Sequence, residues 1–262
     1  MSERILHLGT SGWKYDDWRG AFYPDKPVDE LAFYARRFNT VEIESTWYRT
    51  PARRVVESWR TRVPDGFRFA AKVPREITHD RALLDCADAF NLFLRAIGCL
   101  EDRLGPLLFQ FPPQWTAQEG ASALRDFLPL LPQGWKFAME FRHPSWHEEE
   151  YADWLRAAGI AWTLAETTRF PAKIYATAPF SYIRLLGNRY EPLEPLNSLK
   201  KNRETEETRW AEVIAGLPVS EVWGYFNNHW AGFSPASADA FKTRLGLPLK
   251  NEVEADEQGT LF

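Results

Sequence analysis

The feature that most constrains the fold is a regular alternation of short apolar runs with longer segments of helical periodicity. Strand-like runs begin at residues 5, 40, 67, 107, 137, 160, 180 and 222. Helical patterns lie between them, at 28–37, after Pro51, and at 81–104, 117–131, 148–158, 204–215 and 234–245. Short apolar runs separated by helices are typical of parallel strands that are buried on both faces. The pattern therefore predicts a parallel α/β architecture.

Eight such units within about 250 residues favour a (β/α)8 TIM-type barrel. A doubly wound open sheet is the alternative, but no Gly-x-Gly-x-x-Gly turn follows the first strand-like run. We see no linker that divides the chain and no internal repeat. We therefore expect a single barrel domain over residues 1–250, followed by an acidic tail over residues 251–262.

Composition narrows the classes of function. The 262 residues carry a formal net charge of −4 at pH 7, which argues against a protein that coats nucleic acid through bulk electrostatics. A local basic cleft for nucleic acid is not excluded by this number. The two cysteines, Cys86 and Cys99, lack the spacing of a zinc site. No segment is long and apolar enough to span a membrane, so we expect a soluble, cytoplasmic protein without a membrane partner.

Polar side chains concentrate where the strand-like runs end: Glu42 and Glu44, Lys72, Gln110, Glu140 and Arg142, Glu166, Arg184, Asn227 and Asn228. In (β/α)8 barrels the active site lies at this end of the strands. Lys72, Arg142 and Arg184 follow odd-numbered strands and should converge, so a phosphate, sulfate or carboxylate among them would offset their repulsion. The competing interpretation is a network of internal salt bridges that plugs the barrel mouth.

The segment 139–146 contains three ionisable side chains within four residues. Residues two apart on a strand share a face, so Glu140 and Arg142 should point the same way, with His143 just before Pro144. We interpret these three side chains as an acid, an anchor and a base. The alternatives are a buried Glu–Arg pair that closes the barrel and a surface histidine.

The second strand-like run carries two acids on one face. Glu42 and Glu44 are candidates for a general acid and base or for ligands of a hard metal ion. The alternative is that Lys72 pairs with one of them. Because few of the five histidines fall at strand ends in ligand pairs, we expect no cofactor, although a single Mg²⁺ bound by Glu42, Glu44 or Glu140 is left open.

Aromatic side chains follow several strand-like runs on the same expected rim. Trp13, Tyr15, Trp47, Tyr48 and Trp146 are candidates for stacking on a sugar or a base, with loop packing as the alternative for each. His79 follows Lys72 and is a candidate contact to a ligand, with a hydrogen bond to the backbone as the alternative.

Seven ordered motifs resemble the YecE-like family, which is catalogued as a domain of unknown function. They are GTSGWKYDDWRGAFYP at 9–24, FNTVEIESTWYRTP at 38–51, FRFAAKVPREITH at 67–79, LLFQFPP at 107–113, MEFRHPSW at 139–146, YIRLLG at 182–187 and YFNNHWAGFSPASA at 225–238. The resemblance implies a (β/α)8-type barrel and a soluble protein, but no established reaction. Many members have Asn or Asp where Glu44 stands, and His where Leu186 stands. A mechanism that needs a histidine at the second position does not carry over to this chain.

Together these patterns predict an enzyme that binds an anionic, hydroxyl-bearing small molecule at the barrel mouth. Hydrolysis of a phosphoester or a glycosidic bond is the leading reaction class. The expected catalytic residues are Glu140, Glu42, Glu44 and His143. The expected substrate contacts are Lys72, Arg142, Arg184, Gln110, Asn227, Asn228, Trp13, Tyr15, Tyr48, His79 and Trp146. The alternative is a non-catalytic ligand-binding or adaptor protein linked to DNA metabolism.

The adaptor interpretation rests on residues 258–262, Gln-Gly-Thr-Leu-Phe, which resemble the short peptides that dock bacterial proteins on the replication sliding clamp. A disordered or loosely docked tail is the competing interpretation. If the peptide docks, the full chain binds an immobilised sliding clamp, and deletion of residues 258–262 abolishes that binding in surface plasmon resonance. Failure of the full chain to bind the clamp would exclude this partner.

Overall fold

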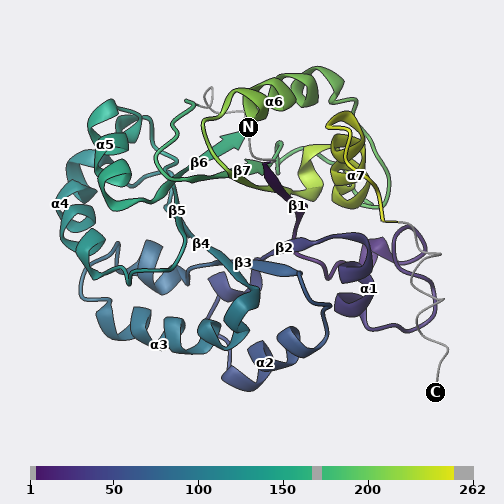
Figure 1. The fold of residues 1–262 in the computed structure, drawn as a ribbon, viewed down its shortest axis with the longest axis horizontal. Coiled ribbons are helices and arrows are strands. Elements are labelled where there is room, and N and C mark those ends of the chain that lie inside the picture. The colour runs from purple at the N-terminus through teal and green to yellow at the C-terminus, as the bar shows by residue number, and fades with distance from the viewer. Residues whose placement is uncertain (1–3, 167–172, 251–262) are drawn as a thin grey trace.

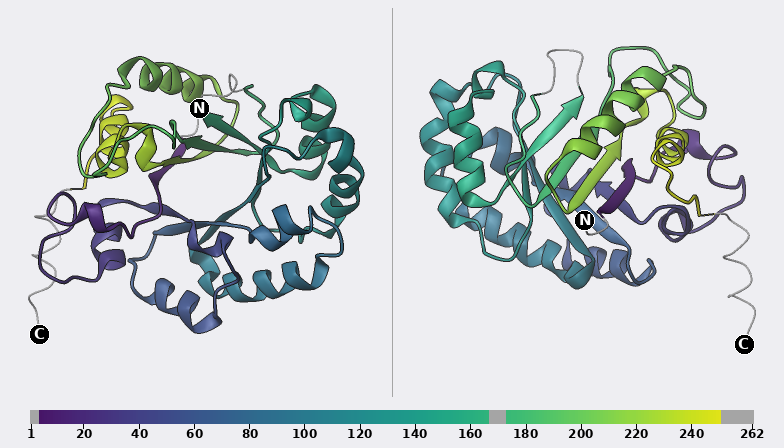
Figure 2. Two further views of the ribbon diagram at one scale, coloured as in Figure 1. Left: turned by 180° about the vertical axis from the view of Figure 1, so that it is seen from behind. Right: turned by 45° about the horizontal axis from the view of Figure 1, so that its top comes forward.

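A computed structural model of the chain describes residues 4–166 and 173–250. Eight parallel strands close into a barrel in chain order, and β8 pairs with β1 to complete the ring. Helices surround this ring when it is seen from the front and from behind (Figures 1 and 2). The expected (β/α)8 barrel is therefore confirmed. The clamp-like peptide at residues 258–262 lies outside the described residues.

The strands are short, as expected for a barrel. They are β1 (Ile5–Ser11), β2 (Thr40–Ile43), β3 (Arg68–Lys72), β4 (Leu104–Gln110), β5 (Phe137–Glu140), β6 (Ala161–Glu166), β7 (Phe180–Leu185) and β8 (Glu221–Phe226). The α-helices are α1 (Glu30–Arg37), α2 (Arg53–Thr61), α3 (Ala87–Ile97), α4 (Ala117–Phe127), α5 (Glu149–Ala158), α6 (Glu204–Gly216) and α7 (Ser234–Arg244).

Short helical turns fill several of the loops. Most are 3₁₀ turns: η1 (Asp16–Trp18), η2 (Ser45–Trp47), η4 (Gly98–Arg103), η5 (Leu128–Leu130), η6 (Pro144–Trp146) and η7 (Asn228–Trp230). The remaining one, η3 (Glu76–Asp80), is a π-helical turn between β3 and α3. Because η2, η3, η6 and η7 each follow the carboxyl-terminal end of a strand, they shape the rim where an active site is expected.

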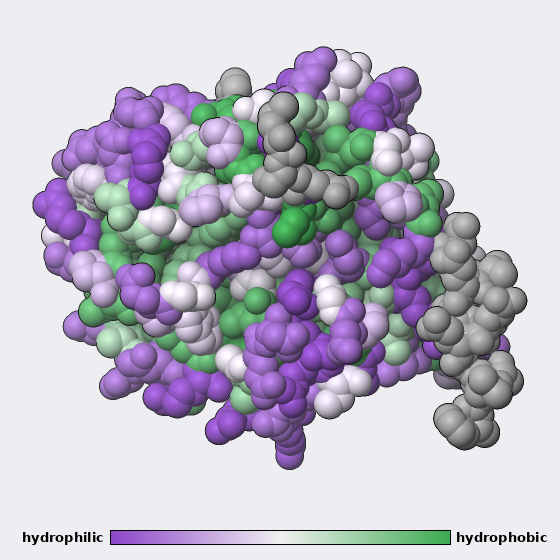
Figure 3. Space-filling model, in the orientation of Figure 1, coloured by the Kyte–Doolittle hydropathy of each residue, from purple (hydrophilic) through white to green (hydrophobic). Residues whose placement is uncertain are grey.

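Two apolar layers hold the barrel together. The larger layer lies between the strands and the outer helices, and the smaller one fills the interior. In the interior, alanines from β3, β5 and β6 leave room for Tyr182, Trp223 and Tyr225 of β7 and β8. This pairing of small with large side chains fills the barrel without a void. Hydrophilic side chains project along outer helices such as α2 and α6 (Figure 3), as expected for helices that bury only one side.

The amino-terminal end of the barrel is closed. His7 of β1 stacks on Trp223 of β8, with ring centroids 3.9 Å apart. The ring of His7 also lies within hydrogen-bonding distance of Glu221 (3.1 Å), which in turn pairs with Lys136. These contacts leave the opposite, carboxyl-terminal end of the barrel as the open mouth.

The predicted helix over 81–104 is wrong in its extent. The regular helix α3 covers only Ala87–Ile97. Before it, Ala82, Leu83 and Asp85 adopt positive φ angles of 48°, 70° and 45°, a left-handed region that residues other than glycine rarely occupy. The turn buries Leu83 and leaves Leu84 exposed. Apolar periodicity in the sequence continues through this turn, so it could not reveal the break.

The outer layer yields a stability prediction at Phe109 of β4. This ring is fully buried and packs against Phe90, Phe127 and Phe137 at centroid distances of 5.7, 5.5 and 6.1 Å. Phe109→Ala should lower the free energy of unfolding by about 3–5 kcal/mol, because it leaves a cavity between β4, α3 and α4. Chemical denaturation followed by circular dichroism measures the loss. The control is Leu130→Ala at an exposed position, and an equal loss in both variants would contradict the packing argument.

Candidate functional site

The open mouth of the barrel contains a cleft with a volume of about 700 Å³. Its walls come from the loops that follow β2, β3, β4, β5, β7 and β8. Among the side chains predicted from the sequence, those that line the cleft are Glu44, Lys72, Gln110, Arg142, Arg184, Asn227, Trp47, Tyr48 and His79. Placement of polar residues at strand ends was therefore an effective guide to the lining.

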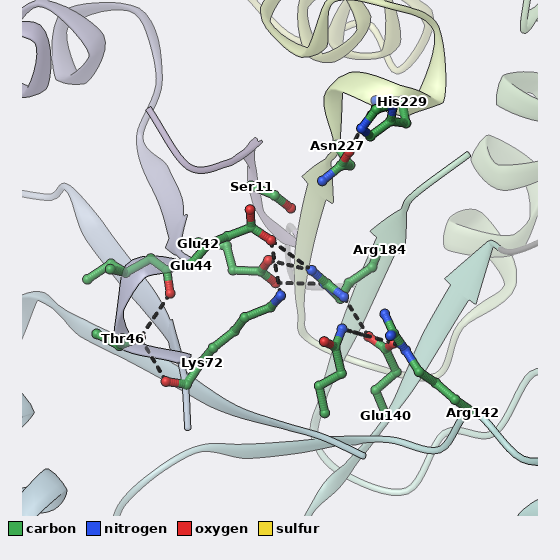
Figure 4. A network of polar contacts seen from close by, with 12 residues as sticks. Ser11, Glu42, Glu44, Thr46, Lys72, Glu140, Arg142, Arg184, Asn227 and His229 are labelled. Atoms are coloured by element: carbon green, nitrogen blue, oxygen red, sulfur yellow. Dashed lines mark hydrogen bonds and ion pairs between the residues drawn. The ribbon is translucent and has the colours of Figure 1, made fainter. Parts of the chain in front are cut away.

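Arg184 of β7 occupies the centre of the mouth. Its Nε and Nη2 donate to the two oxygens of Glu42 at 2.9 and 2.7 Å, and its Nη1 donates to Glu140 at 2.7 Å (Figure 4). A longer contact of 3.5 Å reaches Glu44. Tyr182 donates its hydroxyl to Glu42 at 2.8 Å. This guanidinium therefore ties β2 and β5 together across the barrel.

Glu140 of β5 is held by more than one donor. Arg142 donates from Nε at 2.6 Å, and the Gln110 amide lies 3.1 and 3.2 Å from the two carboxylate oxygens. Burial alone would raise the pKa of Glu140, but Arg142 and Arg184 outweigh it and hold this pKa well below the usual range. Burial would likewise lower the pKa of Arg184, but its carboxylate partners raise it. Both groups are therefore charged at neutral pH.

Glu44 and Lys72 form the outer part of the same network. Lys72 Nζ donates to Glu44 at 3.0 Å, and the two side chains are 10% and 29% exposed, respectively. Burial would raise the pKa of Glu44, but Lys72 and Arg184 lower it below its usual value. Thr46 fixes the loop by donating its hydroxyl to the backbone oxygens of Ile43 and Lys72. Glu44 is thus ionised at neutral pH, and its contact with Lys72 holds both side chains at the cleft.

The three cations that were expected to converge are each paired with a glutamate. Lys72 pairs with Glu44, Arg142 pairs with Glu140, and Arg184 contacts all three glutamates. The internal salt bridges of the competing interpretation are therefore present, yet they leave a cleft in front of them. Glu166, the acid at the end of β6, does not join this network: it accepts from the indole of Trp210 at 2.7 Å and pairs with Arg209 of α6.

The expected group of Glu140, Arg142 and His143 is only partly assembled. Pro144 ends the strand and begins η6, with His143 as its N-cap. The His143 ring is used locally, with Nδ1 2.8 Å from the Ser145 hydroxyl and 3.2 Å from the Ser145 backbone nitrogen. His143 is not among the residues that line the cleft, and its described hydrogen bonds go to Ser145 and not to Glu140 or Arg142.

His79 does reach the cleft, from the π-helical turn η3. Its Nδ1 lies 2.9 Å from the Thr78 hydroxyl, and its ring packs edge-on against Trp47 with centroids 5.2 Å apart. Burial, together with the charges of Arg142 and Arg75, lowers the pKa of His79 to about 4. The imidazole is therefore neutral at pH 7. π-helical turns frequently occur at functional sites.

Several predicted contacts lie away from the cleft lining. Trp146 is fully buried against Trp115 and Phe141, and Trp13 packs on Trp59. Asn228 is buried and accepts hydrogen bonds from Trp18 and from Ser234. These three predicted contacts serve loop packing, because the loops fold back onto the helices. Tyr15 lies behind the lining, where its hydroxyl donates to Ser11 O and lies 3.5 Å from Glu44.

The prediction missed part of the lining, namely Gln114, Asn188, Arg189, Tyr190 and His229. His229 directly follows the strand-end pair Asn227 and Asn228, so the strand-end rule extended by one residue would have found it. Its Nδ1 is buried without a hydrogen-bond partner among the described residues. Arg189 and Tyr190 lie in the long polar segment after β7, and no periodic signal marks which of its residues turn inward.

No group of three His, Cys, Asp or Glu side chains in residues 4–166 and 173–250 is arranged to hold a metal ion. The carboxylates of Glu42 and Glu140 already accept from Arg184, which leaves Glu44 as the carboxylate of the lining. Within the same residues, no helix is long and apolar enough to cross a membrane.

The network yields a prediction at Arg184. Arg184→Met leaves two buried carboxylates without their main partner, which should lower the free energy of unfolding by about 3–5 kcal/mol at pH 7. Because the pKa of Glu140 is lowered in the folded state, its stabilising contribution is present above about pH 4.3 and is lost as the pH falls. The difference between wild type and variant should therefore shrink in acid.

Urea denaturation at pH 7 and at about pH 3, inside the range where Glu140 loses its contribution, measures this difference. The matched control is Arg156→Met on α5, where an exposed arginine pairs with Glu149 and Asp153. We expect near wild-type stability for this control, because exposed ion pairs contribute little. A pH-independent loss in Arg184→Met would show that packing, and not charge, dominates at this position.

Comparison with known proteins places the fold and the motifs in one family. The family described as "Protein of unknown function DUF72" matches residues 7–259. The UPF0759 protein YecE of Escherichia coli K12 is 34% identical over 140 residues, which cover 53% of this chain and 49% of that protein. The UPF0759 protein YunF of Bacillus subtilis is 26% identical over 168 residues, or 59% and 58% of the two chains. The chain thus matches about half the length of these curated relatives.

Solved structures agree with this placement. A DUF72 family protein from Thermotoga maritima superposes with a TM-score of 0.77 at 28% identity, covering 92% of this chain and 99% of that one. A DUF72 family protein from Enterococcus faecalis superposes with a TM-score of 0.75 at 18% identity, covering 95% of this chain and 100% of that one. A D-psicose 3-epimerase, at 10% identity and a TM-score of 0.51, shares the fold alone. The chain therefore belongs to the DUF72 family of unknown function, and it is similar to the YecE and YunF proteins.

Proposed function

We propose that the chain is an enzyme that hydrolyses a phosphoester in a small, anionic, hydroxyl-bearing substrate at the barrel mouth. The observation that carries the proposal is the Glu44–Lys72 pair. It forms the cleft-facing edge of a charge network whose other carboxylates are buried. Perturbed, fixed ionisable groups beside a cleft at the carboxyl-terminal end of a barrel are typical of active sites.

The geometry favours a phosphoester over a glycosidic bond. Glycoside hydrolysis commonly uses two carboxyl groups that flank the scissile bond, one of them protonated. In the described lining, Glu44 is the single carboxylate. Glu140 is 1% exposed, and its lowered pKa leaves it without a proton to donate. A phosphoryl group needs positioning and cationic stabilisation instead, and Lys72 and Arg142 provide both.

The proposed roles follow from these positions. Glu44 accepts a proton from the attacking water as the new bond to phosphorus forms. Lys72 donates a proton to the leaving alcohol oxygen as the ester bond breaks. Because the two groups lie 3.0 Å apart, the proton on Glu44 then returns to Lys72. Arg142, which is 28% exposed, stabilises the charge on the phosphoryl oxygens.

Two amides and an imidazole would orient the substrate. Gln110 and Asn227 line the cleft: the Gln110 nitrogen is held by Glu140, so its oxygen would accept from a hydroxyl group, whereas the Asn227 nitrogen would donate to one. His79 is neutral at pH 7, so it adds a hydrogen-bonding group without further positive charge. A single Mg²⁺ is compatible with this arrangement, with Glu44 and the substrate phosphate as ligands.

The proposal predicts that Glu44→Gln and Lys72→Met each lower kcat about 100-fold or more, because each removes a proton-transfer group. Phosphate release from p-nitrophenyl phosphate and from a panel of sugar phosphates, with and without Mg²⁺, measures turnover. The control is Glu206→Gln on α6, which breaks a surface pair with Arg203 and should retain turnover. If wild-type protein releases no phosphate in any condition, the hydrolase assignment fails and the non-catalytic alternative gains support.

A further inference from the structure

Two aromatic side chains at the rim of the cleft are largely exposed to solvent. Tyr48 and Tyr190 are each 73% exposed, whereas every other Phe, Trp and Tyr in the described residues is buried or half-buried. Both of them line the same cleft, from the loops after β2 and β7. Aromatic rings strongly favour burial, so two exposed rings at a single site indicate a surface that a ligand covers.

The position of Tyr190 is fixed by its local backbone. Gly187 has a φ of 66°, and a Cβ at this residue would lie 1.9 Å from the backbone oxygen of His229. The chain therefore passes directly over η7, which only a glycine allows. The Asn188 side chain then accepts from the Tyr190 backbone nitrogen at 3.1 Å and closes a turn. This turn carries residues 188–190 to the rim.

Among the cationic side chains of the described cleft lining, Arg189 is the one without a carboxylate partner. Lys72, Arg142 and Arg184 each have a glutamate partner, whereas Arg189 has no ion pair within residues 4–166 and 173–250. Its guanidinium lies over the ring of Tyr190, 5.1 Å from the centroid. An anionic group that reaches the outer end of the cleft would therefore meet Arg189 beside an aromatic ring.

The opposite wall is rigid. Tyr48 packs edge-on against Trp47 with ring centroids 5.1 Å apart, and Trp47 is held by His79 and by the guanidinium of Arg75 at 5.3 Å. The Trp47 indole nitrogen is buried and lacks a partner among the described residues. A fixed wall of this kind suits a flat, rigid ligand more than a flexible chain.

We infer that the substrate is a sugar with an anionic group at each end, whose ring packs on Tyr48 and Tyr190. The inference rests on the proposed function, because it places the scissile phosphate at Glu44 and Lys72. The second anionic group lies at Arg189, and the ring hydroxyls face the amides of the lining. Gln114, Asn188 and Asn227 supply paired donors and acceptors, as hydroxyl groups require.

Isothermal titration calorimetry with defined probes tests the inference. The probes are fructose 1,6-bisphosphate, fructose 6-phosphate, inorganic phosphate and 1,6-hexanediol bisphosphate, which carries two phosphates but no ring. Wild type should bind fructose 1,6-bisphosphate most tightly. Tyr48→Ala and Tyr190→Ala should each weaken that binding about tenfold and leave hexanediol bisphosphate unchanged, whereas the Phe variants should retain most of the affinity.

Arg189→Gln separates the outer anion site from the ring contact. This variant should bring fructose 1,6-bisphosphate close to the affinity of fructose 6-phosphate, which itself should change little. Equal binding of the ringed and ringless bisphosphates, with no effect of Tyr48→Ala or Tyr190→Ala, would overturn the inference but leave the phosphoester proposal intact. Tighter binding of adenosine 3′,5′-bisphosphate would overturn the sugar assignment in favour of a base. If no phosphate-bearing probe binds at all, the proposed function fails as well.

Discussion

The guanidinium of Arg184 joins three strands at the centre of the barrel mouth, where it donates to Glu42 of β2 and Glu140 of β5 at 2.7–2.9 Å. Removing such charges from water costs several kcal/mol per ion, and good geometry with further donors is needed to offset that cost. The donors are present: Tyr182 serves Glu42, while Arg142 and Gln110 serve Glu140. An apolar plug of similar volume would close the barrel as well, so stability alone does not explain a charged one.

The charged network connects fully buried groups to partly exposed ones. Glu42 and Glu140 are both buried and both accept from Arg184, and the lowered pKa of Glu140 makes this carboxylate a poor proton donor. Arg184 in turn lies 3.5 Å from Glu44, whose other partner is Lys72. Glu44 and Lys72, which border the cleft, are therefore held in position by the buried guanidinium of Arg184. Such preorganisation is what electrostatic catalysis requires, because fixed charges need not reorganise during a reaction.

The sequence predicted the barrel and much of its lining, since both depend on local signals. Apolar runs locate the strands, and the polar residues at the ends of these runs indicate which side chains reach the mouth of the barrel. Which of these side chains pair is decided only when the ring closes and brings β2, β5 and β7 to a common centre. Whether His143 faces the cleft also depended on the local turn: Pro144 begins η6, and Nδ1 of His143 contacts Ser145 within that turn. Tyr190 was missed because its position depends on a contact between Gly187 and η7, which lie far apart in the sequence.

Two departures from the pattern of the family fall within the cleft. In the family that the motifs resemble, many members have a histidine at the position of Leu186. Many have Asn or Asp at the position of Glu44. Both residues line the cleft, so an imidazole at position 186 would face the same space as the Glu44 carboxylate. The departure at 186 removes an imidazole, whereas the departure at 44 is chemically mild and places a longer carboxylate 3.0 Å from Lys72.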